Sequence, residues 1–150
     1  GCRANCAYCG LARERPGEIT PQVLARMETG FHIPAHEYLD ALRLRARLVK
    51  KYGEEVFSKV DALAAPAVPF SAPTLEETGV GAGEEMSEMI ARLTCFTRMV
   101  SGLGAPAMSL PCGFSSGGLP LALQLIGAPF REDILYRLAY AYECETGGQS

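Results

Sequence analysis

Residues 105–127 read APAMSLPCGFSSGGLPLALQLIG, and residues 128–143 continue as APFREDILYRLAYAYE. The short apolar runs at 107–110 and 121–126 predict two strands, because runs of this length between Gly and Pro are typical of buried strands. The Gly- and Ser-rich residues 113–118 between them have the composition of a turn. The stretch therefore predicts two strands joined by a turn, both buried on two faces.

Helices are predicted on either side of these strands. Glu132 and Asp133 favour a helix start, because negative charge is favourable at a helix N-terminus, and Gly147 ends this helix. Apolar residues at helical spacing predict three more helices, and a compact apolar run bounded by prolines predicts a third strand. The helices are expected at residues 21–29, with Thr20 as the cap, from Pro34 to Gly53, and at residues 84–100. The strand is expected at residues 61–65 and is followed by an extended Pro-rich loop at residues 66–73. Strands alternating with helices predict an α/β fold.

The composition excludes several classes of protein. The chain has 150 residues, 48% hydrophobic and 21% charged, which is ordinary for a globular domain. A net charge of −3 argues against nucleic-acid binding, and no apolar run reaches the roughly 18 residues of a membrane span. Cys95, Cys112 and Cys144 lie in apolar segments and are predicted to be small buried hydrophobes. A reducing, cytoplasmic location follows from this usage of cysteine.

The N-terminus carries three closely spaced cysteines, Cys2, Cys6 and Cys9. Three thiolates in one loop can hold a [4Fe–4S] cluster and leave one iron open to a small molecule. This C-x3-C-x2-C arrangement resembles the cluster motif of radical S-adenosylmethionine enzymes, which implies an iron–sulfur cluster and S-adenosylmethionine as cofactors. A chance cluster, or a zinc site without its fourth ligand, is the alternative. Because this resemblance covers only about 15 residues, we expect a Cys-rich stub at 1–17 and a separate domain at 18–150.

Residues 18–146 resemble a different family. Three segments are similar, in this order, to the C-terminal part of amidase-signature hydrolases: ITPQVLARMETGFHIPAHEYLDALRLRARL, VDALAAPAVPFSAP and FTRMVSGLGAPAMSLPCGFSSGGLPLALQLIGAPFREDILYRLAYAYE. The resemblance implies a partial amidase-signature-like α/β fold, with short strands of a mixed sheet packed between helices. It implies no cofactor.

The same resemblance implies a function. These enzymes cleave the C–N bond of a carboxamide with a serine, a second serine in a cis peptide bond and a lysine, and none of these matches a residue of this chain. We therefore expect no catalytic residue here and no activity of the chain alone. A small amide would be bound through the missing N-terminal half, without direct contact to nucleic acid or a membrane, and oligomerisation is left open. The alternatives are the glutamine-hydrolysing A subunit of a tRNA-dependent amidotransferase, and a remnant of a radical S-adenosylmethionine iron–sulfur enzyme.

Several residues are similar in type or spacing to catalytic or metal-binding residues. Ser115 and Ser116 resemble a nucleophile loop, but their position between two strands predicts a plain turn. His32 and His36 are four residues apart, yet Pro34 stops one helix from presenting both, so no metal site is expected. The lysines are predicted to lie on the surface without a neighbouring serine cluster; they are Lys50, Lys51 and Lys59.

Overall fold

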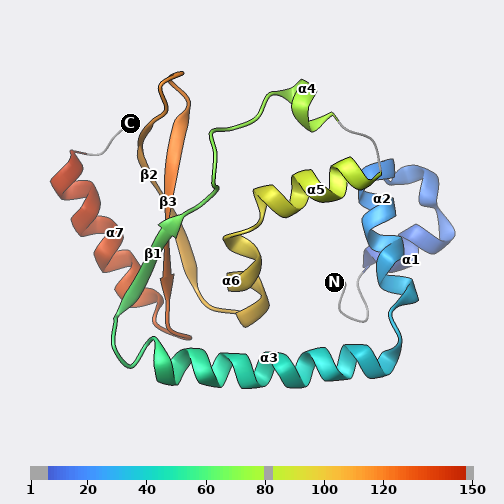
Figure 1. Cartoon of the computed structure of the whole chain (residues 1–150), viewed down its shortest axis with the longest axis horizontal. Coiled ribbons are helices and arrows are strands. Elements are labelled where there is room, and N and C mark those ends of the chain that lie inside the picture. The colour runs from blue at the N-terminus through green and yellow to red at the C-terminus, as the bar shows by residue number, and fades with distance from the viewer. Residues whose placement is uncertain (1–6, 80–82, 148–150) are drawn as a thin grey trace. The chain divides into compact units, whose positions relative to one another are not determined.

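The computed structural model describes residues 7–79 and 83–147 (Figure 1). The chain divides into two units, residues 1–42 with 74–90 and residues 43–73 with 91–150, and each is described by itself. The described part of the first unit is helical. It contains α1 (Ala7–Glu14), a 3-10 turn (Pro16–Glu18), α2 (Pro21–Glu28), a second 3-10 turn (Thr29–His32) and α4 (Leu75–Thr78).

Contacts between short helices hold the first unit together. Helix α1 packs against α2, and the guanidinium of Arg13 lies 4.9 Å from the centre of the Phe31 ring. The predicted helix after Thr20 is confirmed as α2, but the Thr20 side chain makes no capping hydrogen bond. Thr74, in contrast, forms a full capping box with Glu77 at the start of α4.

Helix α3 (Ala35–Glu55) is the longest helix that the structure describes, and it belongs to both units. It continues two residues beyond Gly53, where the sequence predicts its end. Lys50 and Lys51 lie 3.8 and 3.9 Å from the carboxylates four residues later, which supports the last turn. A single glycine therefore does not end this helix.

The predicted helix at 84–100 is wrong in one respect, because it is two helices. Helix α5 (Glu84–Leu93) and helix α6 (Thr97–Leu103) are separated at residues 94–96. The Cys95 amide donates to the Arg92 carbonyl, three residues back, so the chain tightens there. Arg98 then donates to the Thr94 hydroxyl across the break at 3.0 Å.

Helix α6 ends at Gly104, whose φ of 71° is left-handed. The Arg45 side chain reaches this end from α3 and donates to the carbonyl oxygens of Gly102 (2.6 Å) and Leu103 (3.1 Å). Carbonyls at a helix C-terminus have no partner within the helix, so a guanidinium is well placed to satisfy them. These two hydrogen bonds join residues whose separations along the sequence are 57 and 58 positions.

Three antiparallel strands form the sheet of the second unit: β1 (Ala62–Pro66), β2 (Ala107–Phe114) and β3 (Pro120–Gly127). Their order is β1-β3-β2, so β3 is central. All three predicted strands are confirmed, and β2 and β3 are longer than expected. The pairing of β2 with β3 is interrupted between Pro111 and Gly113, which leaves Cys112 as an extra residue in a bulge.

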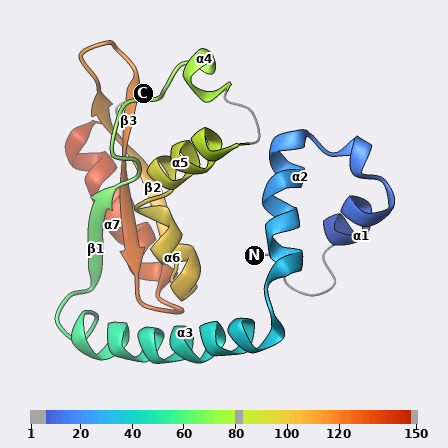
Figure 2. The same ribbon diagram turned by 45° about the vertical axis from the view of Figure 1, so that its right-hand side comes forward.

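Helix α7 (Glu132–Thr146) lies along one face of this sheet, and both Figure 1 and Figure 2 show it there. Side chains alternate between the two faces of a strand, and the face toward α7 carries the core. The buried core residues are Leu110, Leu125, Leu135 and Ala139. Gly127 allows the close approach, because a Cβ there would lie 3.2 Å from Leu135 Cγ.

The opposite face of the sheet is only partly covered. Ile126 and Gln124 of β3 are buried there, whereas Ala107, Ser109 and Pro111 of β2 are exposed. The prediction that both strands are buried on two faces is therefore wrong for β2. Its sequence is as apolar as that of a covered strand, but no described residue of the chain buries these side chains.

The start of α7 carries the charge pattern that the sequence predicts. Arg131 donates to both carboxylate oxygens of Asp133, at 2.9 and 3.2 Å. This hydrogen bonding by the guanidinium holds the pKa of Asp133 below its ordinary value. The carboxylate therefore remains charged at the helix N-terminus, where negative charge is favourable.

Candidate functional site

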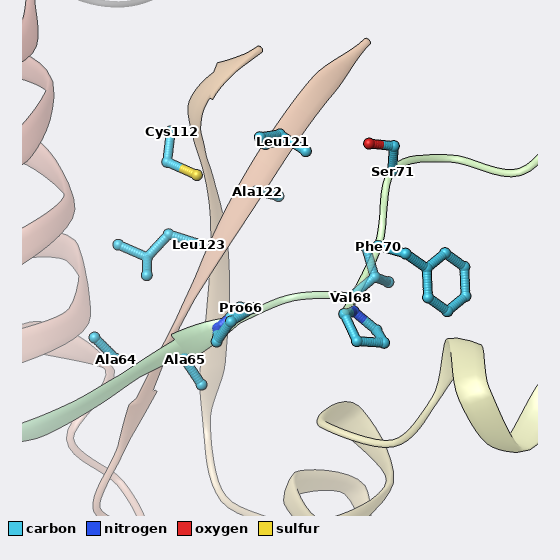
Figure 3. Close-up of a pocket in the computed structure, with 11 residues that line it drawn as sticks. Ala64, Ala65, Pro66, Val68, Phe70, Ser71, Cys112, Leu121, Ala122 and Leu123 are labelled. Atoms are coloured by element: carbon cyan, nitrogen blue, oxygen red, sulfur yellow. The ribbon is translucent and has the colours of Figure 1, made fainter. Parts of the chain in front are cut away.

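The second unit has a pocket at the point where β1 leaves the sheet (Figure 3). Ala67 makes the last contact, donating its amide to the Ala122 carbonyl at 3.0 Å. Prolines then direct the chain away, because they lack the amide proton that a ladder needs. The start of β3 is left facing a cavity of about 440 Å³. We call it the proline-loop pocket; its lining residues are Ala64, Ala65, Pro66, Val68, Pro69, Phe70, Ser71, Cys112, Leu121, Ala122 and Leu123.

The lining of the proline-loop pocket is almost entirely apolar. Its polar side-chain groups are the Ser71 hydroxyl and the Cys112 thiol, and the β2 bulge brings Cys112 to the wall. The Arg92 guanidinium lies 5.0 Å from the centre of the Phe70 ring and so holds the loop from outside. No carboxylate, imidazole or ammonium group is among the lining residues, so the pocket suits an apolar group and offers no acid or base.

The turn predicted at residues 113–118 is confirmed. The Ser115 amide donates to the Leu119 carbonyl (2.8 Å), and the Leu119 amide donates to the Ser115 hydroxyl (3.1 Å). The Gly118 amide closes the turn on the Ser115 carbonyl. The Ser115 hydroxyl is thus occupied in stabilising the hairpin loop, which argues against a role as nucleophile.

Ser115→Ala should lower the free energy of unfolding by about 0.5–1.5 kcal/mol, because it removes the acceptor of the Leu119 amide. Ser116→Ala is the matched control, with the same chemical change one residue further along, and should have little effect. Urea unfolding of the two variants measures both values. Equal losses for the two serines would contradict this account of the turn.

The lysines lie as the sequence predicts. Lys50 and Lys51 face Glu54 and Glu55 on the exposed surface of α3, and both lysine side chains are more than half exposed. Lys59 follows α3 in a turn and is also exposed. The expectation that this chain supplies no catalytic residue stays a prediction.

The histidines and scattered cysteines give one confirmation and one correction. His32 ends a 3-10 turn and His36 lies in α3, so they occupy separate elements as expected. Cys95, Cys112 and Cys144 are exposed, so the prediction that they are buried is wrong. In the described ranges 7–79 and 83–147, no three His, Cys, Asp or Glu side chains are grouped so as to bind a metal ion.

The N-terminal cysteine motif falls largely outside the structure. Cys2 and Cys6 lie outside the described residues. Cys9 belongs to α1, but only its backbone is described. The structure therefore does not test whether these thiols bind a cluster. The iron–sulfur hypothesis stays a prediction.

Comparison with known proteins identifies the family. The amidase family model matches residues 9–135, which is most of the chain. The chain therefore belongs to the amidase family, and the partial amidase-like α/β fold predicted from the sequence is confirmed. The match begins at Cys9, inside the predicted Cys-rich stub, and it gives the radical S-adenosylmethionine resemblance no support. The family uses no cofactor.

Two amidotransferase subunits and one solved amidase show how far the similarity extends. The chain is 37% identical over 138 residues to the A subunit of glutamyl-tRNA(Gln) amidotransferase from Cyanothece sp., covering 89% of this chain and 28% of that protein. It is 40% identical over 130 residues to the same subunit from Moorella thermoacetica, covering 84% and 26%. A solved amidase structure superimposes with a TM-score of 0.75 at 29% identity, covering 92% of this chain and 31% of that one.

The chain thus spans between a quarter and a third of the proteins it matches. Among the helices of the described residues, none has the length and apolar character needed to cross a membrane.

Proposed function

We propose that this chain forms part of an enzyme that cleaves carboxamide C–N bonds, and that its substrate amide is that of glutamine. The observation that carries the proposal is the 37% identity to the A subunit of an amidotransferase, which extends over 89% of the chain. That relative is named as one subunit of an enzyme for glutamyl-tRNA(Gln), so further protein subunits are the expected partners of this chain. We also propose a reducing, cytoplasmic location, since Cys95, Cys112 and Cys144 are free thiols.

The chain's own residues contribute binding rather than bond cleavage. The proline-loop pocket has an apolar lining without an acid or base, which fits a wall that holds the carbon skeleton of a small amide. The attacking serine, the cis-bonded serine and the lysine base belong to the larger part of the domain. The isolated chain is therefore inactive.

A general amidase is the second candidate, and the solved amidase with a TM-score of 0.75 favours it. The two candidates differ in substrate. The A subunit of an amidotransferase releases ammonia from glutamine, whereas a general amidase hydrolyses simple carboxamides such as propionamide. The chemistry at the carbonyl is the same, so the walls of the substrate site decide between them.

The test replaces the matched segment of the Moorella protein with the matching residues of this chain. We expect the chimera to release ammonia from glutamine within about tenfold of the parent rate, which corresponds to about 1.4 kcal/mol in the activation free energy. The parent protein is the positive control, and this chain alone should release none. Hydrolysis of propionamide without glutamine would support the general amidase. A soluble chimera that cleaves neither amide would refute the proposal.

A further inference from the structure

The loop that follows β1 is held by few interactions. We call residues 67–73 the proline loop. The Ala67 amide donates to the Ala122 carbonyl, and beyond that point the described residues form no backbone hydrogen bond with residues 68–73. Pro69 and Pro73 have no amide proton to donate. The position of the proline loop therefore depends on the contacts of its side chains.

Phe70 makes the contact that holds this loop. Part of Phe70 lines the proline-loop pocket, but Figure 3 shows its ring directed away from Leu121 and Ala122 of β3. The guanidinium of Arg92, in α5, lies 5.0 Å from the centre of the ring. A cation is attracted to the face of an aromatic ring, so this contact favours the outward position of Phe70.

The pocket itself is a favourable environment for an aromatic ring. Its volume is about 440 Å³, and its lining is apolar except for the Ser71 hydroxyl and the Cys112 thiol. Transfer of a ring from water to such surroundings is favourable, because it buries apolar surface. Without Arg92, the half-buried Phe70 ring would turn inward and fill the space beside β3. The contact with Arg92 therefore opposes closure of the pocket.

We infer that Arg92 is a positioning residue: by holding the Phe70 ring outside, it keeps the proline-loop pocket open for an uncharged apolar group. The class of ligand follows from the lining, which has no charged side chain to pair with an ammonium or carboxylate group. A carboxamide with a phenyl or branched alkyl group fits this lining, whereas the charged end of glutamine would lie outside. The inference deepens the proposed function by adding this class of substrate. Only the statement that the ligand is a substrate rests on that function.

The Cys112 thiol reports whether the pocket is open, since it lies on the pocket wall. The full chain is treated with the uncharged reagent N-ethylmaleimide, and alkylation of each cysteine is followed by peptide mass spectrometry. Arg92→Ala should slow the alkylation of Cys112 about two- to fivefold, the range expected for the loss of an exposed cation–π contact. Cys144, which is exposed and does not line the pocket, is the internal control and should be unaffected.

A second truncation separates positioning from a general loss of structure. Phe70→Ala removes the ring that would fill the pocket, so the double variant Arg92→Ala/Phe70→Ala should regain the wild-type alkylation rate of Cys112. Arg92→Lys keeps the positive charge and should keep most of that rate. If Arg92→Ala does not slow the alkylation of Cys112, or if the double variant reacts as slowly as Arg92→Ala, the inference is wrong.

Phenylacetamide is the probe for the class of ligand. In excess over the wild-type chain it should protect Cys112 from alkylation, and glutamine at the same concentration should not. The Moorella chimera tests turnover separately, and there Arg92→Ala should raise KM for phenylacetamide about two- to fivefold with kcat unchanged. Protection in the chain together with an inactive chimera would support the inference and refute the proposed function. Equal protection by glutamine, or none by phenylacetamide, would overturn the inference whatever the chimera does.

Discussion

Leu135→Ala should lower the free energy of unfolding by about 2–5 kcal/mol, the largest loss that we expect from a single substitution in this chain. Leu135 is 2% exposed and forms the α7 side of the cluster with Leu110, Leu125 and Ala139. The backbone of Gly127 lies against it, so the sheet cannot collapse much further into the space left by a smaller side chain. A loss of this size is a large fraction of the stability of a small domain. Urea unfolding followed by circular dichroism measures it.

Leu138→Ala is the matched control, because it makes the same chemical change three residues along α7. Leu138 is 40% exposed, so its truncation should cost less than about 1 kcal/mol. A clear difference between the two variants would show that the α7–sheet contact stabilises the second unit. Similar losses would mean that α7 does not pack on the sheet as described.

Gly104→Ala should lower the free energy of unfolding by about 1–3 kcal/mol, for two separate reasons. Its φ of 71° lies in the left-handed region, which costs a residue with a Cβ about 1–2 kcal/mol. The new Cβ would also lie 2.6 Å from the terminal nitrogen of Arg45. Because the arginine end is flexible it can move, but it would then lose its hydrogen bonds to the Gly102 and Leu103 carbonyls. Thermal unfolding of the variant measures the total.

Two control variants separate these reasons. Gly102→Ala changes a glycine inside α6, where no atom lies within 4 Å of the new Cβ, and should stabilise the helix by up to about 1 kcal/mol. Gly104→Asn tolerates the left-handed backbone better and should lose less than Gly104→Ala. If Gly102→Ala were the more destabilising of the two alanine variants, the assigned end of α6 would be wrong.

The sequence predicted the hairpin and its turn well. The runs at 107–110 and 121–126 became the centres of β2 and β3, and residues 113–118 became the loop between them. Such features depend on neighbouring residues, since apolar runs, glycines and the Ser115 hydroxyl act within a few positions along the chain. The Pro-rich loop that opens the proline-loop pocket was predicted for the same reason.

Other features of the structure could not be predicted from the sequence. The bulge that brings Cys112 to the pocket depends on the register of two strands. The exposure of the three scattered cysteines depends on which residues of the chain reach them. The burial of Gln124 was not predicted, because a glutamine within LALQLIG reveals nothing about its neighbours until the register places it opposite Ala65 and Ser109.

By itself, the sequence determined the family, the three strands and the last helix, because these depend on local composition and on motifs in a fixed order. Only the tertiary structure decided which face of the sheet α7 covers, that α5 and α6 are separate helices, and that Arg45 satisfies the end of α6. These features depend on contacts between residues far apart in the chain. The burial of each side chain is a property of its neighbours in space, which the order of residues does not state.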